Sequence, residues 1–210
     1  MAEKINLKDL ERKAWKSFFQ DGLWDIYFGL ILLGLAASQL LYLLPFPELI
    51  NLFIVLIPIY SIAMLILTLG KKYITTPRIG KIKFGLKRKK IKKRLAIIIL
   101  IQVGFTVSMV ILTSLGLFYY LQINSLILML IIGLLFLTFP IGILAFYWDY
   151  PRLYIYGLLG GMGFFIAELL HPIIGEPLNL ILPYSCIATS IIIVGLVYFL
   201  KFLHKYPKVN

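Results

Sequence analysis

The chain has 210 residues, of which 61% are hydrophobic and 14% are charged, and its formal charge at pH 7 is +12. Because soluble domains are only about 45–50% apolar, a water-soluble fold is excluded and lipid is the expected solvent for most of the surface. The single cysteine, Cys186, excludes an internal disulfide and a cysteine-rich zinc site.

The first segment, residues 1–22, has the pattern of an amphipathic helix. Leu7, Leu10 and Phe18 fall on one helical face, and charged residues occupy most of the other positions. Such a helix lies in the plane of the membrane surface, with its apolar face toward the acyl chains. We therefore expect a cytoplasmic surface helix that ends near Gly22.

Six apolar segments follow, and each is close to the ~20 residues that a helix needs to cross the hydrocarbon core. The runs are continuous instead of alternating, which favours helices over strands, since an open sheet leaves unsatisfied edges in lipid. The predicted fold class is therefore all-α, a polytopic membrane protein with six transmembrane helices. The segments are residues 23–44, 48–69, 95–117, 125–146, 153–170 and 178–200.

The basic residues predict the orientation of these helices. Of the 21 basic residues, the amino-terminal arm has five, the loop at residues 71–94 has twelve, the connection before the fifth span has Arg152, and the tail at residues 201–210 has three. All 21 lie on one side if both termini are cytoplasmic, as the positive-inside rule requires. The predicted order is a helix pair at residues 23–70, the basic loop, and four helices at residues 95–200, in the plasma membrane of a prokaryote.

The basic loop contains a segment that looks ordered, TTPRIGKIKFG at residues 75–85. A proline fixes one turn in this segment and a glycine permits another. The segment resembles the TxPRxGxVxF loop of uncharacterised multi-pass membrane proteins from prokaryotes. The resemblance is confined to these residues and implies no activity.

Three interpretations of the loop stay open: a determinant of topology alone, contact with anionic lipids, and docking of an acidic cytoplasmic partner. Because the charge is confined between apolar spans, nucleic acid is not expected as a partner. The residues expected to contact lipid or a partner are Arg78, Lys81, Lys87, Arg88, Lys89, Lys90, Lys92, Lys93 and Arg94.

Ionisable residues inside apolar spans are candidates for an ion or proton route, since a charge in hydrocarbon is costly and usually faces protein or water. Asp25 begins the first span near the cytoplasmic face, where an interfacial ion pair is the alternative. Glu168 lies near the outer end of the fifth span, one turn before His171. The alternative for this pair is a satisfied interfacial glutamate beside a loop histidine, and one ExxH without a second histidine nearby does not predict a metal site.

Small residues and prolines predict how the spans pack and bend. Gly157 and Gly161 have GxxxG spacing, which lets a neighbouring helix approach the fifth span closely. Pro58 and Pro140 lie inside the second and fourth spans, where a proline frees a carbonyl and favours a kink. Kinks of this kind act as joints in transporters, and the alternative is that they have no such role, since proline is common in membrane helices generally.

The sequence contains no zinc-protease, nucleophile-elbow, P-loop or dinucleotide-binding motif, so no enzyme class, cofactor or metal is predicted. The leading hypothesis is a small transporter or permease for an ion or small solute. The alternatives are a non-catalytic membrane subunit or adaptor that docks a partner or anionic lipid through the basic loop, and a lipid-modifying enzyme. The expected partners are the lipid bilayer and either a second copy of the chain or another membrane subunit.

Overall fold

The computed structural model describes residues 19–40, 48–79 and 124–207, with only the backbone given for residues 48–53. It also describes six single residues of the third predicted span and its approach, namely Lys93, Ile97, Ile98, Leu100, Gly104 and Ser108. Within this part of the chain all regular structure is helical. Most of the predicted surface helix, the rest of the third span and residues 80–92 and 94 of the basic loop lie outside the described residues.

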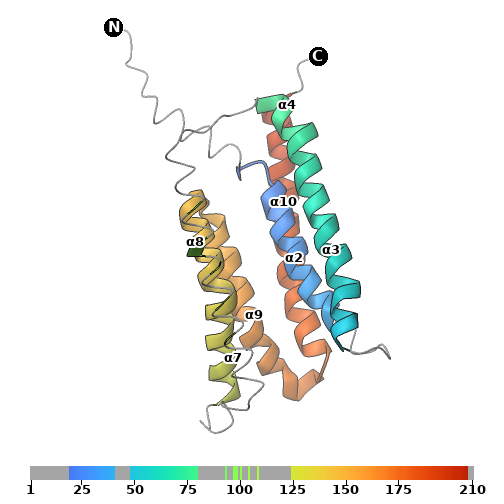
Figure 1. Ribbon diagram of the computed structural model, residues 1–210, viewed down its shortest axis with the longest axis vertical. Helices are drawn as coiled ribbons and strands as arrows, with labels where there is room; N and C mark the ends of the chain where they lie inside the picture. The colour runs from blue at the N-terminus through green and yellow to red at the C-terminus, as the bar shows by residue number, and fades with distance from the viewer. Residues whose placement is uncertain are drawn as a thin grey trace. The chain divides into compact units, whose positions relative to one another are not determined.

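The helices follow the predicted apolar segments closely (Figure 1). Two helical courses contain a widened π-helical stretch between two α-helical parts. The elements are α2 (Leu23–Gln39), α3 (Glu48–Gly70), the π-helical turn η2 (Lys71–Thr75), α4 (Thr76–Ile79), α7 (Ser125–Gly133), the π-helical turn η3 (Leu134–Thr138), α8 (Phe139–Trp148), α9 (Arg152–Ile174) and α10 (Leu178–Lys205).

Four helical segments are long and apolar enough to cross a membrane, which identifies the chain as a helical membrane protein. They correspond to the second, fourth, fifth and sixth predicted spans, while α2 is apolar but has only 17 residues in the described part of the first span. The count of six spans and the orientation remain predictions. The four segments are Ile54–Ile79, Ser125–Trp148, Arg152–Ile174 and Leu178–Lys205.

The basic loop begins later than its composition predicts. After Gly70 the chain stays helical through η2 and α4, so residues 71–79 of the predicted loop continue the second span. A widened turn makes this possible because Pro77 has no N–H to give to the carbonyl four residues earlier, and its ring would collide with that carbonyl in a regular α-helix. In η2 the Thr76 N–H instead reaches the Lys71 oxygen, five residues back.

The fourth predicted span contains the same device. The π-helical turn η3 ends at Thr138, two residues before Pro140, as η2 ends at Thr75, two residues before Pro77. The proline predicted to break this span therefore stands next to a change of helix type. By contrast, α3 remains α-helical through Pro58.

The chain forms two compact units, and the first comprises residues 1–83 and 185–210. Its helices α2 and α3 form an antiparallel hairpin (Figure 1). A side chain added at Gly34 would meet the ring of Tyr60, and one added at Gly70 would meet Leu23. The open end of the hairpin therefore joins the beginning of α2 to the end of α3.

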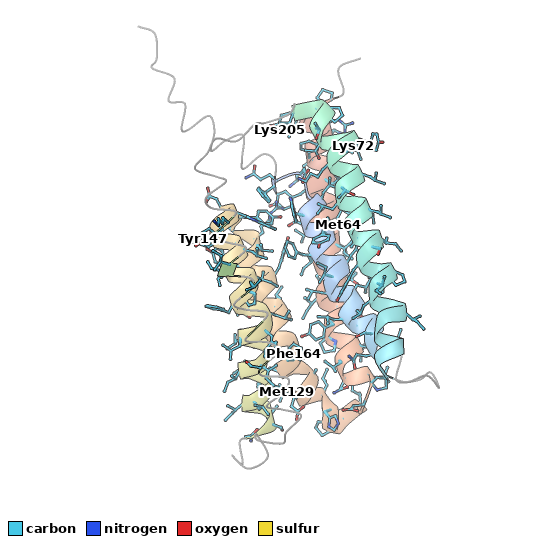
Figure 2. The ribbon with its side chains drawn as sticks, viewed as in Figure 1. Met64, Lys72, Met129, Tyr147, Phe164 and Lys205 are labelled. Carbon is cyan, nitrogen blue, oxygen red and sulfur yellow. The ribbon has the colours of Figure 1, made fainter. Side chains whose placement is uncertain are left out.

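The same α2 packs antiparallel to the second part of α10 through small residues. A Cβ added at Gly22 would collide with the backbone oxygen of Gly195, and one added at Gly29 would lie 3.1 Å from the backbone oxygen of Ala188. Gly22 also has a left-handed φ of 81°, which a glycine adopts at little cost. The start of α2 and the ends of α3 and α10 thus meet at one end of the unit, where Lys72 and Lys205 are labelled in Figure 2.

The second unit, residues 84–184, packs around α9. Its glycines Gly157 and Gly161 are buried, and the Thr138 hydroxyl donates a 2.9 Å hydrogen bond to the Gly157 carbonyl. On another side of α9, the Tyr184 hydroxyl of the first turns of α10 donates a 3.0 Å bond to the Gly160 carbonyl. Close backbone approach therefore holds this unit together on both sides of α9.

Gly161 gives a direct test of this packing. A Cβ at position 161 would meet the Thr138 hydroxyl and the Gly133 carbonyl, whereas a Cβ at Gly142 would have no heavy atom within 4 Å. We expect Gly161→Ala to lower the free energy of unfolding by about 1–3 kcal/mol, the usual cost of overpacking. Gly142→Ala is the matched control and should leave it unchanged or slightly raised. Thermal unfolding in mild detergent, followed by circular dichroism, measures both, and equal melting temperatures would contradict the packing.

Candidate functional site

A cluster of buried polar side chains lies at the end of unit 1 where α2 begins. Asp21 and Asp25 are both 0% exposed, Thr75 is 1% exposed and Lys71 is 9% exposed. Two carboxylates and an ammonium are thus withdrawn from water within a chain whose helices are otherwise apolar. Charged groups rarely occupy such positions without a structural or functional reason.

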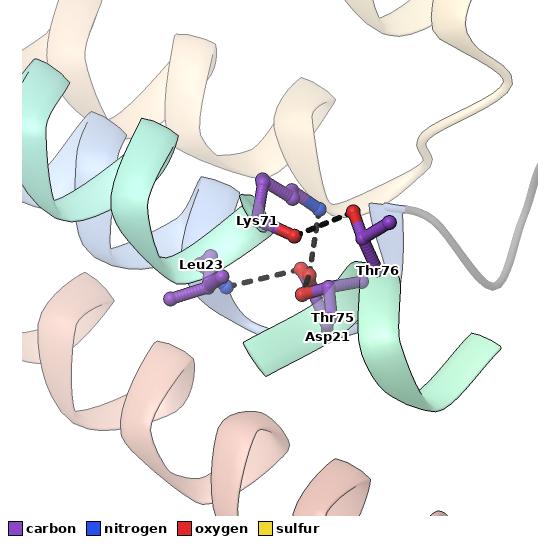
Figure 3. A network of polar contacts seen from close by, with 5 residues as sticks. All are labelled: Asp21, Leu23, Lys71, Thr75 and Thr76. Atoms are coloured by element: carbon purple, nitrogen blue, oxygen red, sulfur yellow. Dashed lines mark hydrogen bonds and ion pairs between the residues drawn. The ribbon is translucent and has the colours of Figure 1, made fainter. Parts of the chain in front are cut away.

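Asp21 is the centre of this cluster (Figure 3). One carboxylate oxygen accepts a 3.2 Å hydrogen bond from the backbone N–H of Leu23, at the start of α2. The other oxygen accepts 2.6 Å bonds from the Lys71 ammonium and the Thr75 hydroxyl. The negative charge therefore lies at the positive end of the α2 dipole and is held by three donors, which compensates much of the cost of removing it from water.

The widened turn η2 brings both donors to the same carboxylate. Lys71 and Thr75 are its first and last residues, and both side chains point to Asp21. The turn is closed at the Lys71 carbonyl, which accepts the backbone N–H of Thr76 and also a 2.7 Å bond from the Thr76 hydroxyl. Such π-helical turns are frequent at functional sites because they turn side chains away from the regular α-helical positions.

Asp25 belongs to the same region and faces α10. A Cβ added at Gly195 would lie 3.0 Å from the Asp25 Cβ, so the glycine leaves room for this aspartate between the two helices. Asp25 is also close enough for its charge to act on Lys71. The cluster thus combines side chains from α2, the segment before it and η2, against a glycine of α10.

Sequence reasoning found Asp25 but missed Asp21 and Lys71. The pattern of residues 1–22 places Asp21 in the surface segment, and the charge count places Lys71 among the loop lysines that set topology. A usable signal was present, since Asp21 precedes the first span, Lys71 follows the second, and the two ends of a helical hairpin lie side by side. An acid at one end and a base at the other can therefore pair across the hairpin.

The other predicted ionisable candidates, Glu168 and His171, belong to unit 2. Glu168 is half-buried on α9, and His171 is exposed near the end of that helix. The His171 Nε2 lies 3.8 Å from the Glu176 carboxylate, and both side chains are more than half exposed. Among the residues that the structure describes, no group of three or more histidine, cysteine, aspartate or glutamate side chains could hold a metal ion.

Two hollows on the described surface are lined mainly by apolar side chains. One of about 760 Å³ lies along α3 beside Tyr60 and Thr68, and another of about 500 Å³ lies beside Thr138 and Tyr147. Neither hollow is lined by Asp25 or by the Glu168 side chain. These two hollows therefore do not lead water or ions to the buried cluster.

Most basic residues predicted to contact lipid or a partner lie outside the described residues. The exceptions are Arg78, which is half-buried in α4, and Lys93, which is exposed and helical. Comparison with protein-family models, with curated proteins and with solved structures gives no match. The resemblance of residues 75–85 to the loop of other membrane proteins stays a prediction.

The pairing of Asp21 with Lys71 makes a prediction about stability. Removing one partner of a buried pair leaves an uncompensated charge and costs about 3–5 kcal/mol. We expect Asp21→Asn and Lys71→Met each to destabilise the protein strongly, and the double variant to lose much less than the sum of the two. Unfolding of the four proteins in mild detergent gives the coupling energy from the double-mutant cycle.

The neighbouring exposed lysine supplies the control for this cycle. Lys72→Met removes the same charge one residue away, and it should change the free energy of unfolding by no more than about 0.5 kcal/mol, as is usual at surface sites. If the effects of Asp21→Asn and Lys71→Met simply add in the double variant, the two side chains are not coupled.

Proposed function

We propose that this protein is a small transporter or permease for a cation or a proton-coupled solute, with the Asp21, Asp25 and Lys71 cluster as its ion-handling site. The observation that carries the proposal is the complete burial of both aspartates beside a lysine, within a unit of apolar helices. Ionisable side chains are costly inside membrane helices and are therefore rare there. Where they occur, they mark ion pathways and proton relays.

The three groups have different roles in this proposal. Asp21 accepts bonds from three donors, so it positions Lys71 and is not the group that exchanges an ion. Asp25 is the exchanging carboxylate, because it is buried, it can bind a proton or a cation through its oxygens, and its charge acts on Lys71. Lys71 is held beside the aspartates by the widened turn η2 and by its bond to Asp21.

The proposal includes six spans with both termini on the cytoplasmic side of a prokaryotic plasma membrane. Contacts within unit 1 support it, because they bring the start of α2 and the ends of α3 and α10 to one end. The three most basic segments of the chain adjoin these helix ends. In unit 2, α9 and the start of α10 are antiparallel, which agrees with two successive spans that run in opposite directions.

Flux through proteoliposomes tests the transport proposal. The purified full chain is reconstituted, and sodium, potassium or proton gradients are imposed while internal pH and ion content are recorded. We expect flux of at least one of these cations through the native protein, and a loss of at least about tenfold in Asp25→Asn, since the exchanging charge is removed. Retained helix content and elution volume of the variant show that the loss is not unfolding.

Two further variants assign the flux to a site. Asp149→Asn removes a carboxylate at a position with φ 53°, where asparagine is well tolerated, and it should leave the flux unchanged. Glu168→Gln tests the other candidate route. Loss of flux in Glu168→Gln with normal flux in Asp25→Asn moves the ion route to α9, and a native chain that passes none of the three cations contradicts transport.

A further inference from the structure

Three exposed lysines at one end of unit 1 each lie over a tyrosine ring. The Lys72 ammonium is 5.2 Å from the ring centre of Tyr73, Lys201 is 5.7 Å from that of Tyr198, and Lys205 is 5.6 Å from that of Tyr206. A lysine over an aromatic face is attracted by the ring quadrupole, so each pair holds its charge beside an amphipathic ring. We name these six residues the lysine–tyrosine collar.

The helix contacts put the collar at one level of the unit. Asp21 is bonded to Lys71, and the adjacent Gly22 lies against Gly195 and Phe199 of α10. The residues that follow on α3 and α10, Lys72 and Lys201, are therefore within about two helical turns of a common plane, at 1.5 Å of rise per residue. Lys72 and Lys205 are seen at the same end of the unit in Figure 2.

The collar coincides with the edge of the apolar surface. Leu69 on α3 is 48% exposed and Leu200 on α10 is 57% exposed, as expected for side chains that face acyl chains. The next exposed side chains after Leu69 are Lys72 and Tyr73, and Leu200 lies between the exposed Tyr198 and Lys201. Tyrosine and lysine prefer the headgroup level of a bilayer, where the ring and the alkyl stem stay apolar and the polar tip reaches water or phosphate.

The charges of the collar are not compensated by acids of the described chain. No carboxylate of the described residues lies within ion-pair distance of Lys72, Lys201 or Lys205, and both nearby aspartates, Asp21 and Asp25, are fully buried. The collar therefore presents three ammonium groups, with adjoining apolar side chains on the membrane side. A ligand that fits must combine a negative headgroup with an acyl chain.

We propose that the lysine–tyrosine collar binds the phosphate headgroups of anionic phospholipids in the leaflet at this end of the protein. The ammonium groups contact the phosphate, the tyrosine rings lie at the glycerol level, and the acyl chains run along the exposed apolar faces of α3 and α10. Soluble anions would gain only the charge contacts. The collar acts independently of transport and uses none of the residues of the buried cluster.

Lipid retention by the purified full chain tests the proposal. The protein in mild detergent is titrated with phosphatidylglycerol or with phosphatidylcholine of the same acyl chains, and bound lipids are counted by native mass spectrometry. Each surface lysine contributes about fivefold to the affinity for an anionic membrane, so the triple variant K72Q/K201Q/K205Q should bind phosphatidylglycerol roughly 100-fold more weakly. Its affinity for phosphatidylcholine should stay the same.

Matched variants separate the collar from net charge. K72R/K201R/K205R keeps the charge and should keep the preference for phosphatidylglycerol, and K87Q/K89Q/K90Q removes the same three charges from the basic stretch and should lose less. If the two glutamine variants lose the same affinity for phosphatidylglycerol, the binding depends on net charge alone, and the proposal is overturned. Equal retention of the two lipids by the native chain would also overturn it, as would complete displacement of phosphatidylglycerol by inorganic phosphate.

Discussion

The contact between the Asp21 carboxylate and its three donors is the constraint on which unit 1 depends. It connects a residue before the first span with Lys71 and Thr75 of the widened turn η2 in the second, fifty or more positions later in the chain. Because it also accepts the Leu23 N–H, the same carboxylate fixes where α2 begins. One fully buried side chain therefore fixes three things together: where α2 begins, where the turn after α3 lies, and where the Lys71 ammonium is held.

Proline is used in the same way in both units. In each, a threonine ends a π-helical turn two residues before a proline, and its hydroxyl donates a hydrogen bond to a neighbouring segment, from Thr75 to Asp21 and from Thr138 to the Gly157 carbonyl. In a regular α-helix the proline ring would collide with the carbonyl group four residues earlier. The widened turn avoids that collision and directs the threonine hydroxyl toward its partner. The π-helical turn therefore also provides a hydrogen bond to a neighbouring segment.

The elements that depend on local sequence were predictable, and those that depend on pairing were not. Continuous apolar runs gave the positions of α3, α9 and α10, since a helix is the way for a lone segment to satisfy its backbone in lipid. The helical course through Pro77 was missed, because loop composition and a proline both predict an end there. Lys71 was missed for a different reason, namely that its role depends on which residue faces it, and a charge count does not contain that information.

Unit 1 is discontinuous in the chain, and this has a consequence for how the protein is made. The α2–α3 hairpin leaves the ribosome early and can close through its own ion pair before the rest of the chain exists. Its glycine face, with Gly22 and Gly29, fits the backbone of the second part of α10, which is synthesised only after unit 2. Until then that face is open to lipid or to a chaperone, so membrane insertion of the hairpin and completion of its fold are separate events in biogenesis, divided by the synthesis of the whole second unit.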